Sequence, residues 1–377
     1  MKYINKRDRN SNLEILRIIS MILIVAFHCN FNFKFESSNN IFNVLIYSTG
    51  IWGILGVDCF FIISFNFLQE SKFKSKKFLH LILQILFYTI IFIILANKIT
   101  NISVLKILMS RINDPIWSNV YWFVTIYLLV YLSFPLLNKI LNNLNKMTIK
   151  KIIILFTIII FFFQMSESVI EDYFFAIYIY IVCYYLKKFN IKFGRKNCKI
   201  YFVITSLIII FLKIIYTYSN ICDLFIKIIA GDFGRHSILF FIDSIFLFYI
   251  FDEMPKRSSK IINKISSSVF GVYLIHENQI LSLRDYIYFL FARNIKWLSE
   301  DGFLFNKFLL YITEIIIIFL LGITIEFIRQ NIFEKFILSY FDVKINTYYN
   351  KIDNWVNDEK LEGVKNEIIN AHMLRAM

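Results

Sequence analysis

Residues 12–30, NLEILRIISMILIVAFHCN, have the character of a first membrane helix. The stretch is mostly apolar, but it holds Arg17 near its start and His28 near its end. At 100° per residue, eleven steps come within about 20° of three full turns and rise roughly 16.5 Å, so the two side chains share one face. Glu14 lies on the same side, where it can pair with Arg17. This face suits a long ligand with a phosphate at one end and a reactive group at the other.

Arg17 and His28 each allow two interpretations. A guanidinium binds phosphate well, and an imidazole at membrane depth can act as a general base. The simpler interpretation makes Arg17 a topology signal at the cytoplasmic edge of the helix and His28 an interfacial side chain. The motifs farther along the chain favour the functional interpretation.

The composition indicates a membrane protein. Of the 377 residues, 58% are hydrophobic and only three are proline, and the mean hydropathy is +0.61. A soluble domain of this length is not so apolar. The net charge of +14 does not indicate nucleic acid, because the basic residues lie in short loops between apolar runs. The five cysteines show no disulfide or metal spacing, so we expect no metal.

Ten apolar runs have about the length of a membrane helix. They cover residues 13–31, 50–69, 78–97, 120–138, 152–166, 172–187, 199–217, 236–251, 265–281 and 308–328. Basic loops such as 70–77 alternate with poorly basic ones such as the acidic loop at 166–172, which predicts that both termini are cytoplasmic. The predicted fold class is all-α and polytopic, with about ten transmembrane helices. A transmembrane domain at 1–330 would precede a partly helical cytoplasmic tail at 331–377.

The second run contains GIWGILGVDCFFIIS, starting at Gly50. Its three closely spaced glycines allow another helix to approach. Asp58 would lie about a third of the way into the bilayer, where an ionised carboxylate costs roughly 2.5–3.5 kcal/mol. We therefore expect Asp58 to face the bundle interior and to have a partner. A structural partnership with an Arg or His and a catalytic role are both open.

Two later motifs add polar groups at the outer side. Tyr121 and Trp122 open the fourth run, as residues of an aromatic belt do. The ninth run, SSSVFGVYLIHENQ, places His276 about ten residues from its cytoplasmic start. His28 and His276 are thus two of five histidines, both expected in the outer halves of inward-facing helices.

Four segments, in this order along the chain, resemble the membrane-bound acyltransferase 3 family. The Arg-x10-His spacing of the first run resembles the signature of that family. GVDCFFIIS resembles its second-helix pattern, YWFVTIYLLVYLSFPLLN its fourth-helix segment, and SSSVFGVYLIHEN its late Tyr-Leu-Ile-His segment. The EILRIISM and VYLIHEN stretches are most similar to members that O-acetylate cell-surface polysaccharides.

The resemblance implies an acyl-CoA donor, with acetyl-CoA expected, and a hydroxyl acceptor on a cell-surface or lipid-linked glycan. It also implies site residues, carried over by position. The catalytic set would be His28, Arg17 and Asp58, and the substrate-binding set Glu14, Trp122 and His276. Two departures from the family pattern are Phe65 in place of a glycine and KKFLHLILQ in place of an Arg-rich start of the third helix.

We therefore expect an integral membrane O-acyltransferase. Its expected partners are the surrounding membrane lipid and other proteins of polysaccharide assembly. The alternative is a glycolipid transporter or flippase, because intramembrane Asp and His also mark substrate paths. Transporters often carry repeated halves, and the sequence shows none. A glycan polymerase would need a larger external loop than residues 282–307.

Overall fold

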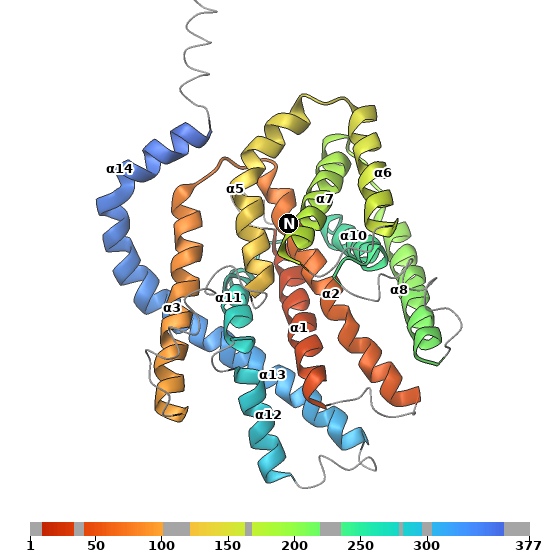
Figure 1. Cartoon of the computed structure of the whole chain (residues 1–377), viewed down its shortest axis with the longest axis vertical. Coiled ribbons are helices and arrows are strands. Elements are labelled where there is room, and N and C mark those ends of the chain that lie inside the picture. Colours follow the sequence, from red (N-terminus) through yellow and green to blue (C-terminus); the bar gives the residue numbers. More distant parts are fainter. Residues whose placement is uncertain are drawn as a thin grey trace, which may run out of the picture.

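Helices make up the architecture of the computed structural model (Figure 1). The structure describes residues 10–33, 41–100, 121–162, 168–218, 235–278, 282–295 and 304–357, and within these ranges it has no strand. The helices are α1 (Ser11–Phe33), α2 (Ile41–Leu68), α3 (Ser75–Thr100), α5 (Trp122–Asn142), α6 (Lys146–Phe162), α7 (Val169–Lys188), α8 (Arg195–Tyr218), α10 (Ile238–Asp252), α11 (Lys260–His276), α12 (Leu283–Asn294), α13 (Leu304–Arg329), the π-helix η6 (Gln330–Leu338) and α14 (Ser339–Val356).

Each of the ten predicted membrane runs coincides with a helix. Among the described residues, six spans are long and apolar enough to cross a membrane: α1, α3, α5, α7, α8 and the segment from α13 into η6. The predicted runs in α6, α10 and α11 fall on helices of 17, 15 and 17 residues. The chain is thus an all-helical membrane protein, while the number ten stays a prediction. The terminal segments 1–9 and 358–377 and the run ends at 163–166 and 279–281 lie outside the described residues.

Helix α1 lies at the centre of the bundle and contacts α2, α10, α11, α12 and α13. Its approach to α2 depends on the glycines of α2. A Cβ added to Gly56 would lie only 2.6 Å from the carbonyl oxygen of Ser20, and one added to Gly53 would meet the side chain of Phe27. The predicted close approach of helices is therefore confirmed at these two positions. Gly50 lies where the structure does not describe side-chain packing.

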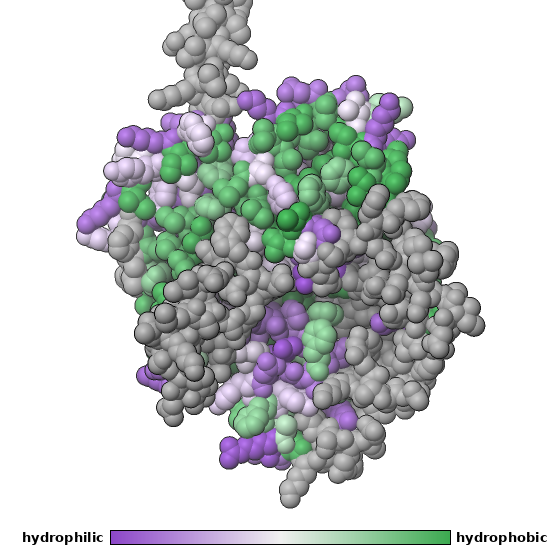
Figure 2. Space-filling model, in the orientation of Figure 1, coloured by the Kyte–Doolittle hydropathy of each residue, from purple (hydrophilic) through white to green (hydrophobic). Residues whose placement is uncertain are grey.

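The outer surface of several helices is apolar. Large side chains such as Leu155 of α6, Leu207 of α8 and Leu320 of α13 are exposed. Figure 2 shows apolar residues over the upper part of the described face, between hydrophilic residues along its upper rim and a second hydrophilic group lower down. Apolar surface on this scale fits hydrocarbon rather than water as the neighbour.

One end of the bundle is basic, and we call it the basic end. It is formed by the start of α1 and the connections α2–α3, α5–α6, α7–α8 and α10–α11, which carry lysines such as Lys74 and Lys192. Here the Ser11 backbone N–H donates to the carbonyl of Arg257 at 2.9 Å, and Asn12 donates to the carbonyl of Pro255 at 3.1 Å. In Figure 1 the α5–α6 connection lies at the top, and α12 marks the opposite end.

Candidate active site

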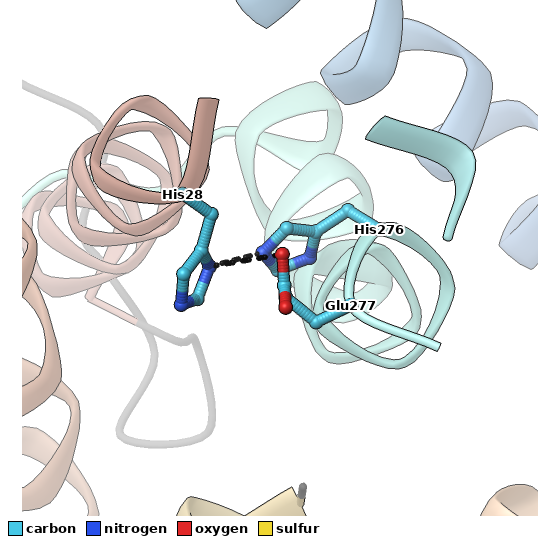
Figure 3. Close-up of side chains that lie close together, drawn as sticks. All are labelled: His28, His276 and Glu277. Carbon is cyan, nitrogen blue, oxygen red and sulfur yellow. Dashed lines mark hydrogen bonds and ion pairs between the residues drawn. The ribbon is translucent and has the colours of Figure 1, made fainter. Parts of the chain in front are cut away.

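Two histidines from different helices meet near the end of α1 that lies away from the basic end. The distance from Nδ1 of His28 to Nε2 of His276 is 2.9 Å (Figure 3). His28 lies in the last two turns of α1, and His276 is the last residue of α11. The two residues are 248 positions apart in the sequence, so it is the packing of α11 against α1 that joins them.

The hydrogen bonds of this pair assign its protons. Nδ1 of His276 lies 2.9 Å from the carbonyl oxygen of Val272. A carbonyl can only accept, so this Nδ1 carries a proton and donates it. In a neutral His276 the other nitrogen, Nε2, is then an acceptor, and Nδ1 of His28 donates to it. Nε2 of His28 is left with a free lone pair, and Figure 3 shows it pointing away from His276 and Glu277.

An acid and a guanidinium lie beside the histidine pair. Oε1 of Glu277 is 3.8 Å from Nδ1 of His28 and 3.3 Å from Nε of Arg284. Nη1 of Arg284 donates to the carbonyl oxygen of His28 at 2.6 Å. This bond fixes α12 against the backbone of α1 at the histidine. The four residues therefore form one cluster, which we call the histidine site.

Two buried polar atoms of the histidine site lack a hydrogen bond. Oε1 of Glu277 and Nε of Arg284 lie at ion-pair distance, but their geometry is not that of a hydrogen bond, and neither atom has a hydrogen bond to another described residue. Buried polar atoms are nearly always satisfied, so each unsatisfied one calls for an explanation. A polar group of a ligand is an explanation that fits their place beside His28.

The histidine site also has the composition of a metal site. Ligand atoms of His28, His276 and Glu277 all lie within 4.8 Å of one another, and such a set can hold a divalent cation. In the structure, however, the His276 lone pair accepts the proton of His28, and Arg284 lies against the carboxylate of Glu277. Both features use electron pairs that a metal would need. The arrangement favours proton transfer, and the expectation of no metal stays a prediction.

The predicted pairing of Glu14 with Arg17 is confirmed. Nη1 of Arg17 donates to both carboxylate oxygens of Glu14 at 2.8 Å, and the guanidinium lies 5.5 Å from the ring centroid of Phe67. Glu14 is buried and also accepts a hydrogen bond from Ser266 of α11. Its carboxylate is thus occupied by protein groups, so in this structure Glu14 orients Arg17 and joins α1 to α11.

Asp58 faces the interior, as predicted, and is 1% exposed. The partner that we expected is not found in the described part of the chain, where Oδ2 of Asp58 has no hydrogen bond. The two obvious candidates are already engaged, because Arg17 pairs with Glu14 and His28 pairs with His276. Among the described residues no Arg or His takes this place, and the expected partner of Asp58 stays a prediction.

Trp122 lies at the start of α5, with the guanidinium of Arg235 4.4 Å from its ring centroid. The neighbouring Tyr121 hydroxyl donates to the carbonyl of Leu274 at 2.9 Å and accepts from Asn278 at 2.7 Å. The start of α5 is therefore fastened to the end of α11. No contact between Trp122 and the histidine pair is found in the described residues, so its role toward substrate stays a prediction.

Sequence reasoning missed Arg284 and gave Glu277 no role. Arg284 lies on α12, inside residues 282–307, for which the sequence predicts an external loop. Nothing in the spacing of α12 relates it to α1. The only available signal was the adjacency of Glu277 to His276.

The histidine site and Arg17 lie within the segment that matches a known family. A family model described as an acyltransferase domain matches residues 10–329, from just before α1 to the end of α13. Comparisons with curated proteins and with solved structures found no match.

Proposed function

This chain belongs to the acyltransferase 3 family, and from that membership we propose that it moves an acyl group from acyl-CoA to a hydroxyl of a cell-surface or lipid-linked glycan. The expected group is acetyl, since the sequence most resembles members that O-acetylate surface polysaccharides. The observation that carries the proposal is the hydrogen-bonded pair of His28 and His276, which leaves one nitrogen of His28 free. Family membership does not favour the alternative of glycolipid transport.

In the proposed reaction, Nε2 of His28 accepts the proton of the acceptor hydroxyl as its oxygen attacks the thioester carbonyl. The carbon–sulfur bond of the tetrahedral intermediate then breaks, and the proton on Nε2 passes to the departing CoA sulfur. His28 is cationic between these steps, and Glu277 lies 3.8 Å from its Nδ1, where a carboxylate stabilises the charge. Attack by Nε2 itself, giving an acyl-histidine, would use the same free nitrogen.

We propose that Arg284 stabilises the negative charge that develops on the thioester oxygen. Its Nε is buried without a hydrogen-bond partner among the described residues, and its Nη1 holds the backbone of His28 at 2.6 Å. A fixed donor next to the base can stabilise the oxyanion of the tetrahedral intermediate. His276 is a positioning residue, because it orients His28 and is itself fixed by the Val272 carbonyl.

The donor would enter from the basic end, with its phosphates near Arg17. Eleven residues of helix separate Arg17 from His28, roughly 16.5 Å, a span that a pantetheine arm can cover. A cavity of about 360 Å³ also opens at this end, lined by residues that include Lys74, Lys76, Lys77 and His80. Lys76 and His80 pair with Asp342 and the lining also includes Glu334, but with Lys74, Lys77 and Arg329 it stays net positive, which favours an anionic ligand.

The proposed orientation follows from the donor and from the loop charges. Acyl-CoA is cytoplasmic, so the basic end and both termini would be cytoplasmic, as positively charged loops generally are. The histidine site would then lie toward the outer face, where a surface glycan and its assembly partners can reach it.

The proposal is tested with purified protein in proteoliposomes, given acetyl-CoA and an extracted surface glycan. Release of free CoA, followed with a thiol reagent, should depend on the glycan. His28→Ala should lower kcat by about 10²–10⁴-fold, the usual contribution of a positioned base. A wild-type protein that releases no CoA would overturn acyl transfer, and a His28→Ala variant with normal turnover would overturn the base.

A further inference from the structure

Helix α14 has one face that is fastened to the start of α3. At 100° per residue, Asp342, Tyr349 and Asp353 fall within an arc of about 40°. Asp342 accepts from Nε2 of His80 at 2.9 Å and pairs with Nζ of Lys76 at 2.9 Å. Asp353 and Tyr349 accept hydrogen bonds from Ser75, the first residue of α3. The polar face of α14 therefore lies against the first two turns of a helix that can cross a membrane.

The end of α14 is held as well. Oδ1 of Asp353 accepts from the Ser75 backbone N–H at 2.6 Å, and the Tyr349 carbonyl accepts from the Ser75 hydroxyl at 3.3 Å. Asn357 forms a pair of hydrogen bonds with the backbone of Phe73, one of 2.9 Å and one of 3.1 Å. These contacts hold α14 from its first turn to its last, and Figure 1 shows α14 beside α3.

The opposite face of α14 carries aromatic and basic side chains. Five of its residues fall within an arc of about 80°, on the side turned away from α3. We call them the aromatic–lysine face, and they are Tyr340, Lys344, Tyr348, Lys351 and Trp355. The three aromatic side chains are 59, 66 and 81% exposed. The two lysines lie beside them, with Nζ of Lys344 4.5 Å from the ring centroid of Tyr340 and Nζ of Lys351 6.0 Å from that of Tyr348.

The position of α14 indicates which environment the aromatic–lysine face meets. Because its polar face meets Lys76 and His80, α14 lies at the level where α3 enters the membrane. Tyr and Trp are the side chains enriched at this level, and lysines near a bilayer surface are attracted to anionic headgroups. The aromatic–lysine face combines rings that can enter the headgroup region with ammonium groups that can meet anionic lipid, which suits a helix in the interface plane.

We propose that α14 lies on the membrane surface at the basic end and docks on anionic lipid headgroups through its aromatic–lysine face. The proposal is independent of the chemistry at the histidine site. Docked in this way, α14 connects the lipid surface to the α2–α3 connection at Phe73 and to the cavity that Leu338 lines.

The test measures the depth of a spin label in the full-length protein, reconstituted in vesicles of phosphatidylcholine and phosphatidylglycerol. Tyr348→Cys places the label on the aromatic–lysine face. Asn350→Cys is the matched control, because it is also exposed but lies about 160° around the helix. Both are made with Cys222→Ser, since the four cysteines of the described residues are buried.

We expect a water-soluble nickel chelate to relax the label at 348 several-fold less than the label at 350, with oxygen showing the reverse. Adding Lys344→Glu and Lys351→Glu should raise nickel access at 348, as should vesicles of phosphatidylcholine alone. Equal nickel access at the two positions in the anionic vesicles would overturn the proposal and leave the face to water or a protein. If the label at 348 stays protected from nickel both in the lysine variants and in vesicles of phosphatidylcholine alone, anionic headgroups have no role in docking.

Discussion

Two buried ion-pair clusters, one around Glu326 and the other at the histidine site, differ in how fully their polar atoms are hydrogen-bonded. Glu326 accepts hydrogen bonds on both oxygens from Arg329, and further ones from Tyr88 at 2.6 Å and Gln84 at 3.1 Å. At the histidine site, Glu277 and Arg284 lie 3.3 Å apart without a hydrogen bond between them. Chemically similar groups are thus saturated in the Glu326 network and left partly unsatisfied at the histidine site.

This difference separates holding a structure from acting on a ligand. A saturated network rigidifies the helices that it joins, because every polar group has its partner without outside help. The Glu326 network joins α3 to α13 in this way. A site for chemistry needs groups that the protein itself leaves available, such as Nε2 of His28. We therefore expect substitutions in the Glu326 network to change stability and those at the histidine site to change turnover.

The largest loss of stability should follow Glu326→Leu. Removing one partner of a buried ion pair typically costs about 3–5 kcal/mol, because the other charge remains buried. Arg329 is buried, and the Tyr88 hydroxyl would lose its acceptor as well. Thermal unfolding in detergent, followed by circular dichroism, should show a large fall in Tm.

Glu334→Leu is the matched control for that change. Glu334 also pairs with Arg329 at 2.8 Å, but its side chain is 43% exposed, and Arg329 keeps Glu326. Its Tm should hardly move, and the Tm of His28→Ala should hardly move either. If Glu326→Leu unfolds no earlier than Glu334→Leu, the saturated network does not hold α3 and α13 together.

A smaller effect on activity is expected at Arg17. It lies on the same helix as His28, but its guanidinium is already hydrogen-bonded to Glu14. Arg17→Ala should raise the KM for acyl-CoA about tenfold, since hydrogen bonds to charged groups are worth about 1.5–3 kcal/mol, with a smaller loss in kcat. Initial rates of CoA release at varied acyl-CoA would measure both constants. Glu14→Gln, which keeps Arg17 but loosens its orientation, should show a weaker effect of the same kind. An unchanged KM in Arg17→Ala would reduce Arg17 to a structural and topological residue.

The smallest effect concerns pH and the contact between α14 and α3. Burial alone would raise the pKa of the Asp342 carboxyl, but hydrogen bonds from His80 and Lys76 outweigh it and hold the pKa below its ordinary value of 3.8. A depressed folded-state pKa means that the contact stabilises fully above pH 3.8 and is lost as the pH falls through the lower value. The contribution should be about 0.2–1 kcal/mol, since Lys76 is half exposed.

The motion of a spin label at residue 350 can report this contact. In the wild-type background it should become more mobile only below pH 3.8, whereas with Asp342→Asn it should be mobile at neutral pH as well. A wild-type label whose mobility is constant down to pH 2 would contradict the stabilising role of Asp342.

Sequence patterns predicted ten of the described helices, though not α12, and one face of α1, and those predictions rest on local periodicity. The spacing of Glu14, Arg17 and His28 needs only helical geometry. Contacts between helices are a different matter. Arg284 is 256 positions from His28 in the sequence. It lies on a short helix that no apolar run predicts.

Two other features were also beyond sequence reasoning. Nε2 of His28 is free because Nδ1 of His28 donates to His276, whose own Nδ1 donates to the Val272 carbonyl. Both bonds require His276, the last residue of α11, to lie against α1. Oδ2 of Asp58 has no hydrogen bond to a described residue, and this follows from how α2 packs against its neighbours. Both depend on tertiary packing, which a single sequence does not encode as a pattern.

The most direct test of the central claim asks whether His28 and His276 act as one unit. CoA release is measured for the wild type, His28→Ala, His276→Ala and the double variant, each with an unchanged Tm. If His276 works only by orienting His28, its loss should lower kcat in the wild-type background but cost nothing once His28 is gone. The double variant should then turn over at the rate of His28→Ala. Losses that multiply would contradict the claim, because His276 would then contribute to turnover without His28.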